Sequence, residues 1–279
     1  SKDNVTRKTF NFVYLTNYDI VVDASIANDG DLVNGKPAYK TVQAAVNAAG
    51  SSRTVIFVKA GSYKERLVVD KPNISIIGED RENTLIHCYP GELGEDYEAG
   101  ADMKLRCATY IMEGSKGFSA ENIAFANDYV YSTPDNKSNK SADALRCDAD
   151  EASFVNVKFS SVQDTLYMDK GKQYYNKCLI EGSIDFIYSG ETATSLFDDC
   201  TIKFVYESTK PSGYVAAPKT KAAQEYGLIF NNCVITSEEG CSGTGYLLAR
   251  NWGASASATW VNCFMGDVLY TKQPYAPMG

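Results

Sequence analysis

The chain has 279 residues, of which 44% are hydrophobic, so it can bury a large core and is not disordered as a whole. Its formal net charge is −8 and no cluster of Lys and Arg compensates for it, which argues against nucleic acid and anionic membranes as partners. No stretch of the sequence approaches the length of a membrane span, so membrane insertion is not expected. Elongated β architectures often reach this length as one domain, and we expect residues 1–279 to form a single domain.

One helix is predicted near the N-terminus, over residues 41–50. Thr41 precedes apolar residues spaced i, i+3, i+4 and i+7 and can cap the helix, while Gly50 can end it. A stack of strands needs a cover at its open end, because the terminal coil would otherwise expose its core and its pairing edge. We therefore expect this helix to close the N-terminal end of such a stack.

Short segments rich in β-forming residues follow, and their recurrence predicts the fold. Three lie at residues 54–58, 73–77 and 121–125. A phrase that opens with an aromatic residue and ends in Val or Cys three positions later then recurs, at residues 154–157, 175–178, 197–200, 230–233 and 260–263. The opening aromatics are 21, 22, 33 and 30 residues apart, as in coils that keep one register while loops of varying length leave them. This pattern predicts a parallel β-helix; a β-sandwich of short strands is the alternative, but it would not return the same residue types in phase.

The eight cysteines fall into two groups of four. One group ends the repeated phrase and consists of Cys178, Cys200, Cys233 and Cys263. Small thiols in such a position can pack on one another in the interior, so we expect a ladder of reduced cysteines. The other group consists of Cys88, Cys107, Cys147 and Cys241. A disulfide between two of these is possible, and the sequence does not decide it.

The single histidine, His87, limits the chemistry that the chain can perform. A Ser-His-Asp or Cys-His hydrolase needs a base of near-neutral pKa, and the segment around His87 has no nucleophile signature, so catalysis by histidine is not expected. The sequence has no CxxC pair, and with one histidine it lacks a zinc constellation. We expect no metal site.

Two aspartates occupy equal positions in successive repeats. Asp164 and Asp185 are 21 residues apart, and each lies ten residues after an aromatic that opens the phrase. Adjacent coils are roughly 4.8 Å apart, so the two carboxylates should lie side by side and separate their pKa values, as paired acid chemistry requires. Gln163 adds an amide donor suited to a developing oxyanion. Either aspartate could instead only cap a turn, and the pair would equally suit a glycosidase.

The residues around this pair resemble one known family. The segments QDTLY at 163–167, GSIDFIY at 182–188 and LARNW at 248–252 resemble the QDTLY, G-x-x-DFIFG and LGRPW segments of pectin methylesterases, in the same order. GSYKE at 61–65 and ADALR at 142–146 resemble the family's G-x-Y-x-E and QAVALR, so the resemblance spans roughly residues 38–265. It implies a right-handed parallel β-helix, which with the expected helix makes an all-β fold with a short N-terminal capping α-helix. It also implies hydrolysis of the methyl esters of galacturonate in pectin, without a cofactor.

The resemblance also implies roles for individual residues. Asp185 corresponds to the nucleophile that attacks the ester carbonyl, and Asp164 to the acid that protonates the departing methanol and then activates water. Arg250 would hold the nucleophile in its ionised form, and Gln163 would donate to the oxyanion. The implied substrate-binding set consists of the platform Trp252, the cleft residues Tyr167 and Tyr188, and also Ser141 and Ala217.

Some positions depart from the family's pattern. Ser141 stands where the family has a second oxyanion glutamine, Asp143 where it has a small apolar residue, and Tyr188 where it has Phe. Ser141, together with Pro218, leaves open a non-catalytic pectin-binding β-helix as an alternative. A pectin lyase or polygalacturonase on the same fold is a further alternative with less support. The expected partner is methyl-esterified pectin, a polymer too large for uptake, so the expected location is extracellular or at the cell surface.

Two further expectations concern the surface. Because the net charge is negative, an acidic substrate would need a locally basic or neutral groove, to which Arg106, Arg146 and Arg250 could contribute, although ion pairing explains the first two more simply. In a glycosylating host, the acceptor sites would be Asn4, Asn73, Asn136 and Asn139.

Overall fold

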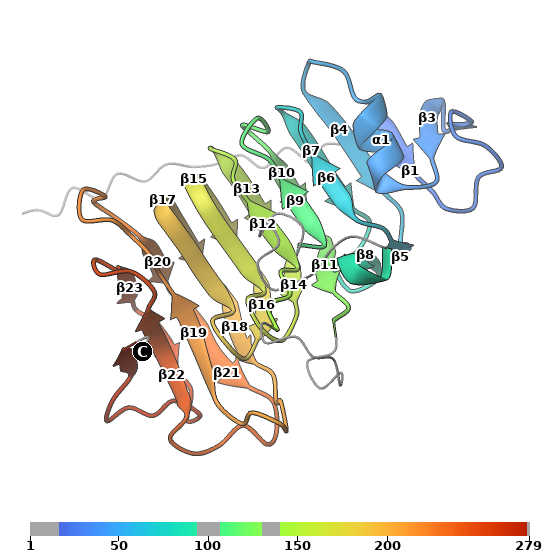
Figure 1. The fold of residues 1–279 in the computed structure, drawn as a ribbon. Coiled ribbons are helices and arrows are strands. Elements are labelled where there is room, and N and C mark those ends of the chain that lie inside the picture. The colour runs from blue at the N-terminus through green and yellow to red at the C-terminus, as the bar shows by residue number, and fades with distance from the viewer. Residues whose placement is uncertain (1–16, 94–106, 130–139, 278–279) are drawn as a thin grey trace, which may run out of the picture.

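The computed structural model describes residues 17–93, 107–129 and 140–277, so Arg106, Asn4, Asn136 and Asn139 lie outside the described residues. Short strands follow one another around a common axis and stack into coils, from the N-terminal end to the C-terminal end (Figure 1). All strand pairs are parallel except the hairpin of β2 (Leu32–Val33) and β3 (Lys36–Tyr39). The predicted parallel β-helix is thereby confirmed.

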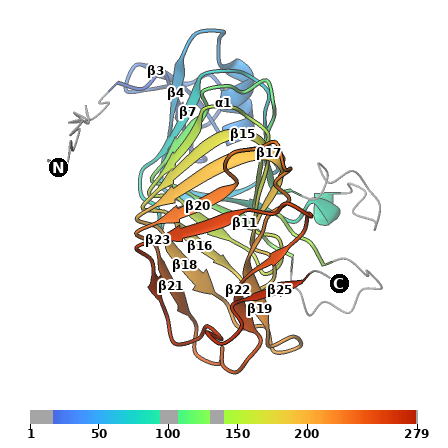
Figure 2. The ribbon, with the colours of Figure 1, turned by 90° about the vertical axis from the view of Figure 1, so that its left-hand side faces the viewer.

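Each coil contributes one strand to each of three faces. The first face consists of β1 (Ile20–Val22), β4 (Thr54–Val58), β7 (Ile74–Gly78), β10 (Ser119–Glu121), β13 (Ala152–Val155), β20 (Leu228–Asn231) and β23 (Ala258–Val261), together with the second halves of β15 (Leu166–Asn176) and β17 (Ile187–Asp198). These strands cross the molecule one below the other (Figure 2).

The second face is an eight-stranded sheet of β5 (Gly61–Lys64), β8 (Thr84–Cys88), β11 (Ala124–Asn127), β14 (Lys158–Ser160), β16 (Leu179–Gly182), β18 (Thr201–Phe204), β21 (Val234–Ser237) and β24 (Phe264–Met265). The third face consists of β6 (Leu67–Val69), β9 (Thr109–Ile111), β12 (Leu145–Cys147), the first halves of β15 and β17, β19 (Gly213–Ala217), β22 (Tyr246–Asn251) and β25 (Tyr275–Pro277). β15 and β17 run through two faces and bend where their register shifts, between Met168 and Lys170.

The aromatic residues of the repeated phrase form one continuous stack inside the first face. Ring centroids are 4.8 Å apart between Phe154 and Tyr175, 4.6 Å between Tyr175 and Phe197, 4.8 Å between Phe197 and Phe230, and 4.0 Å between Phe230 and Trp260. The ring planes are nearly parallel, and all of the rings but that of Trp260 are fully buried. The phrase returns in phase because each coil must add one ring to this stack.

The cysteines that end the phrase stack in the same way. Each thiol lies 3.4 or 3.5 Å from the carbonyl oxygen of the aromatic residue one coil earlier, as in Cys200 to Tyr175 and Cys233 to Phe197. The structure describes all eight cysteines, and none of them forms a disulfide. The reduced ladder is confirmed, although Cys263, in the terminal coil, is only partly buried.

The predicted helix is present as α1 (Val42–Ala48) and packs on the first coils through Val42, Ala45 and Val46 (Figure 1). The Thr41 side chain caps it by accepting from the Ala44 N–H at 3.1 Å. Glu65, from the GSYKE segment, accepts from the backbone N–H groups of Val42 and Gln43, each at 2.8 Å. Burial raises the pKa of Glu65, against the effect of these two bonds. The helix therefore belongs to the N-terminal end, as expected.

Two local predictions were wrong. Ala49, with φ of −62° and ψ of 140°, leaves the helix in an extended conformation, so Gly50 does not form a left-handed cap. The segment 121–125 is not one strand, because Asn122 has φ of 53° and turns the chain between β10 and β11. Asn156, Asn232 and Asn262 take the same conformation at the equivalent turn, since asparagine tolerates the left-handed region better than other side chains.

No helix in the described part of the chain is long and apolar enough to cross a membrane.

Candidate active site

The two aspartates lie at the corner between the second and third faces, in adjacent coils. Gln163 pairs with Ile184 and Leu166 with Ile187, so a constant offset of 21 residues places Asp164 beside Asp185. Both residues are in the left-handed region, with φ of 61° and 51°. Asp185 is 5% exposed and Asp164 is partly exposed. The turn before Asp185 needs Gly182, because a Cβ there would overlap the Phe186 side chain that packs beneath it.

Arg250 holds Asp185 from β22, which is separated from β17 by β19. Its Nε donates to Asp185 Oδ1 at 2.7 Å, and its Nη2 donates to Oδ2. The guanidinium also lies 4.5 Å from the centre of the Tyr214 ring. The bond to Asp185 raises the pKa of Arg250 above its usual value, against the effect of burial, and the charge of Asp164 contributes in the same direction. This two-point contact fixes the orientation of the Asp185 carboxyl group.

Four of the five expected substrate-binding residues form one cluster on the third face. Tyr167 and Tyr188 are stacked, with centroids 4.2 Å apart and planes 6° apart. Trp252 lies across both rings, 6.3 Å from Tyr167 and 5.9 Å from Tyr188, and Ala217 is next to Tyr188 in register. Trp252 is only half-buried, so it presents apolar surface to solvent beside the aspartates.

Ser141, the fifth, is buried one coil before Gln163. The backbone N–H of the next residue, Ala142, donates to the Gln163 carbonyl at 3.1 Å. In the same segment the fully buried Asp143 accepts from the Tyr188 hydroxyl at 2.7 Å. Two of the departures from the family's pattern thus contact each other. Sequence reasoning did not connect them, although Asp143, Asp164 and Asp185 are spaced 21 residues apart.

Arg146 belongs to a structural network next to the site. Its Nε and Nη2 lie 2.9 Å from carboxylate oxygens of Asp148 and Asp169 respectively, and its guanidinium packs on Tyr110 and Tyr167. Tyr167 also donates to Asp169 at 2.6 Å. The expected ion pairing of Arg146 is confirmed. Sequence reasoning did not name these partners, although Asp148 follows Arg146 by two residues and Asp169 lies 21 residues after Asp148.

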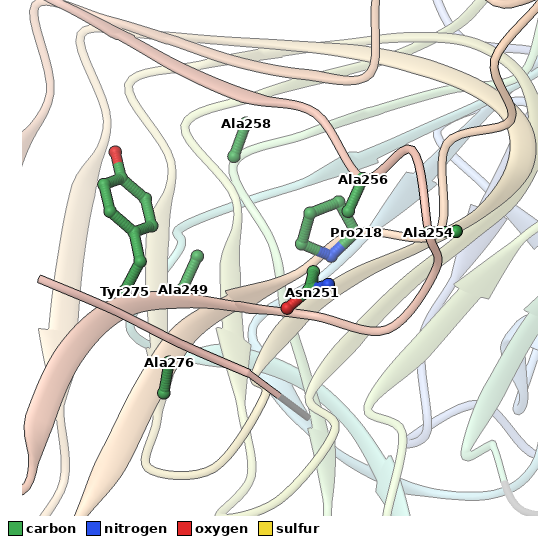
Figure 3. A pocket seen from close by; sticks show the side chains of 8 residues that line it. All are labelled: Pro218, Ala249, Asn251, Ala254, Ala256, Ala258, Tyr275 and Ala276. Carbon is green, nitrogen blue, oxygen red and sulfur yellow. The ribbon is translucent and has the colours of Figure 1, made fainter. Parts of the chain in front are cut away.

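The surface is hollowed on both sides of the aromatic cluster. One pocket of about 320 Å³ is lined by Pro218, Ala249, Asn251, Ala254, Ala256, Ala258, Tyr275 and Ala276 (Figure 3). A second of about 320 Å³ is lined by Tyr167, Asp169, Lys170, Gly190, Glu191, Thr192 and Lys219. The Lys219 ammonium lies 5.0 Å from the centre of the Trp252 ring. Within the described residues, no group of three His, Cys, Asp or Glu side chains is arranged to hold a metal ion.

Fold and site together define a parallel β-helix protein with a carboxylate pair beside an aromatic cluster. A family model described as pectinesterase matches residues 23–275, and the chain belongs to the pectinesterase family. Probable pectinesterase 8 from Arabidopsis thaliana is 34% identical over 248 residues, which are 85% of this chain and 59% of that protein. Pectinesterase 31 from the same plant is 36% identical over 230 residues, covering 79% of this chain and 68% of that protein.

The chain thus spans about three fifths of the length of Probable pectinesterase 8 and about two thirds of that of Pectinesterase 31. Among solved structures, the pectin methylesterase PemA from Erwinia chrysanthemi matches with a TM-score of 0.78 and 27% identity, over 94% of this chain and 81% of that one. A pectin methylesterase crystallised with a hexasaccharide matches with the same TM-score, identity and coverage. The resemblance seen in the sequence is confirmed.

Proposed function

We propose that the chain hydrolyses the methyl esters of galacturonate units in pectin, which yields methanol and a free carboxylate. The observation that carries the proposal is the two-point contact of Arg250 with Asp185, which lies beside Asp164 and next to an aromatic cluster whose Trp252 is half-buried. Membership of the pectinesterase family supports the reaction, and the relative solved with a hexasaccharide supports a carbohydrate substrate.

In the first step, an Asp185 carboxylate oxygen attacks the ester carbonyl carbon and forms a tetrahedral intermediate. Protonated Asp164 gives its proton to the methoxy oxygen, so methanol leaves and an anhydride joins Asp185 to the substrate. In the second step, Asp164 takes a proton from water, and the resulting hydroxide attacks the anhydride. Asp185 departs as a carboxylate, and both aspartates return to their starting forms.

Gln163 would stabilise the charge that develops on the carbonyl oxygen. It immediately precedes Asp164, is partly exposed, and is held in register by its bridge to Ile184. Removing one such donor in other enzymes costs about 2.7–4 kcal/mol of transition-state stabilisation. A Gln163→Leu variant should therefore lower kcat by at least about a hundredfold.

Substrate binding would use the aromatic cluster beside the aspartates. Trp252 offers a half-exposed face to a sugar ring, and Tyr167 and Tyr188 support it from beneath. Ala217 is the small residue in register with Tyr188. Ser141 lies in the coil before Gln163, on the side away from Ile184. The polymer is too large for uptake, so we place the activity outside the cell or at its surface.

Methanol release from methylated pectin tests the proposal. Asp185→Asn should abolish release and Asp164→Asn should lower it by several orders of magnitude. Asp199→Asn is the matched control, because Asp199 shares the left-handed conformation, with φ of 54°, but lies at an exposed turn. A wild-type rate no higher than that of Asp185→Asn would sink the proposal. Pectin binding without release would instead indicate the non-catalytic alternative, and chain shortening of de-esterified polygalacturonate would indicate a lyase or polygalacturonase.

A further inference from the structure

The single histidine lies between a serine and an aspartate. Ser62 Oγ is 2.7 Å from His87 Nε2, and Asp128 Oδ2 is 2.7 Å from His87 Nδ1. Both distances are those of short hydrogen bonds, and the order of atoms is that of a serine nucleophile, an imidazole base and an orienting carboxylate. Ser62 precedes His87 by 25 residues and Asp128 follows it by 41, so no local motif announced this arrangement.

The second face of the β-helix positions all three residues. Ser62 is on β5, His87 on β8, and Asp128 directly follows β11, so they come from three successive coils. The backbone N–H of Asp128 donates to the Cys88 carbonyl at 3.1 Å, which fixes the aspartate next to the histidine. The aspartate pair belongs to the two coils that follow, after β14 and β16.

The geometry selects the tautomer that a general base needs. An ionised carboxylate only accepts hydrogen bonds, so Asp128 requires the proton of neutral His87 to sit on Nδ1. Nε2 is then left with its lone pair and accepts the Ser62 hydroxyl proton. The His87 side chain is 16% exposed and that of Asp128 is 31% exposed, so the imidazole is held yet accessible.

A backbone donor for an oxyanion is also present. The Gly61 and Glu65 N–H groups donate to the carbonyl oxygens of Asn83 and His87, on the side of β8. Because the N–H groups of a strand alternate in direction, the Ser62 N–H points to the opposite edge. β5 is the last strand of its sheet, and no other described strand pairs with it on that side. The residue in register with His87 on the next strand is Ala126, whose side chain is small. A small side chain at this position leaves room for a short acyl group.

We propose that Ser62, His87 and Asp128 form a second, serine-dependent esterase site that hydrolyses esters of short carboxylic acids such as acetate. Ser62 Oγ attacks the acyl carbon while His87 Nε2 takes its proton, and the same proton then goes to the departing alkoxide, which leaves as an alcohol. Water next gives a proton to Nε2 and its hydroxide attacks the acyl-serine. Ser62 leaves with that proton, so the cycle consumes one water and needs no cofactor.

The test uses the full chain with the aspartate site silenced by Asp185→Asn. In this background we measure hydrolysis of p-nitrophenyl acetate and labelling by a fluorophosphonate, with the labelled peptide identified by mass spectrometry. The site predicts label on Ser62, and a loss of at least about a hundredfold in hydrolysis for Ser62→Ala or His87→Ala. Asp128→Asn should cost nearly as much, because an amide can hold the imidazole in the wrong tautomer.

Ser160→Ala is the matched control. Ser160 is on β14 of the same sheet, in register with Ala126, and its hydroxyl contacts Glu181 instead of a histidine. This variant should keep full hydrolysis and labelling. The proposal is overturned if Ser62→Ala hydrolyses p-nitrophenyl acetate as fast as its Asp185→Asn parent, or if the fluorophosphonate leaves Ser62 unmodified. Neither result depends on methanol release from pectin.

Discussion

Arg250 contacts both oxygens of Asp185, and only arginine can make this contact with one planar group. Arg250→Lys keeps the positive charge but offers a single ammonium. We expect kcat for methanol release to fall about 10- to 100-fold, because one hydrogen bond to a charged group contributes about 1.5–3 kcal/mol. Steady-state kinetics on methylated pectin would measure this loss. Arg53→Lys is the control, because the Arg53 side chain donates a hydrogen bond to Ser75, far from the aspartate pair. This variant should retain the wild-type rate.

Tyr188 and Asp143 both depart from the family's pattern, and the hydrogen bond between them should couple their contributions to stability. Tyr188→Phe keeps the stacked ring but removes a hydroxyl that donates to a fully buried carboxylate. We expect it to lower the free energy of unfolding by about 1–3 kcal/mol, and a double-mutant cycle with Asp143→Val to give a coupling energy of about 1–2 kcal/mol. Urea denaturation of the four proteins measures both quantities. A coupling energy indistinguishable from zero would contradict the stabilising role of this bond.

At this scale the sequence predicted contacts where residue phase or a family motif carried the information. The 21-residue interval placed Asp164 beside Asp185, and Arg250 was placed through the LARNW segment. The hydroxyl of Tyr188 reaches a residue 45 positions away, and His87 finds partners 25 and 41 positions away. Such contacts depend on how far a side chain extends across coils, which residue spacing alone does not determine.

The aromatic stack of the first face contains two buried polar atoms without a hydrogen-bond partner among the described residues, the Tyr175 hydroxyl and the Trp260 Nε1. The Tyr175 hydroxyl is buried and has no hydrogen-bond partner among the described residues. Tyr175→Phe should therefore keep the ring stacking and raise the free energy of unfolding by about 1 kcal/mol, because an unsatisfied buried hydroxyl is removed. Tyr174→Phe is the matched control: its hydroxyl is exposed and donates to Asp198, so the change should stay within about 0.5 kcal/mol. A destabilised Tyr175→Phe protein would show that the hydroxyl has a partner, such as water.

An ion pair joins the ends of β1 and β4 near the N-terminal cap. Lys59 Nζ lies 2.6 Å from Asp23 Oδ2, and this hydrogen bond lowers the pKa of Asp23 from its usual 3.8 to about 2. Because the folded pKa is the lower one, the contribution to stability is present above the unfolded pKa and is lost as the pH falls from about 4 to about 2. The stability difference between wild type and Asp23→Asn should shrink over this window. Thermal melts at several pH values would reveal a constant difference if the pair were not responsible.

The elements themselves were predictable where a coil repeats a side chain in the core. The aromatic and cysteine positions marked the turn between the first and second faces, because each coil must fill the same place in the interior. The strands β15 and β17 were not foreseen as continuous through two faces, since their bend depends on a register shift after Met168. Asn122 split a predicted strand because its left-handed backbone conformation ends one face and begins the next.

At the scale of the whole molecule, the net charge of −8 bears on the proposed reaction. Demethylation adds one negative charge per ester cleaved, so the product is increasingly repelled by an acidic protein, while a fully methylated chain is almost neutral. The Debye length falls from about 30 Å at about 10 mM salt to about 8 Å at about 150 mM, which screens such long-range repulsion. We expect kcat/KM on sparsely methylated pectin to rise a few-fold over this range, and kcat/KM on highly methylated pectin to change little.

Initial rates of methanol release on the two pectins, at matched ester concentration, would separate this effect from changes in the polymer. The opposite result is informative as well, because Arg250 and Lys219 lie beside the aromatic cluster and carry positive charge. If kcat/KM on sparsely methylated pectin falls with salt, attraction by these two local charges outweighs repulsion by the molecule as a whole. Lys219→Gln would then be expected to remove most of that salt dependence, since Lys219 lies 3.6 Å from Glu191 at the groove and is still 40% exposed.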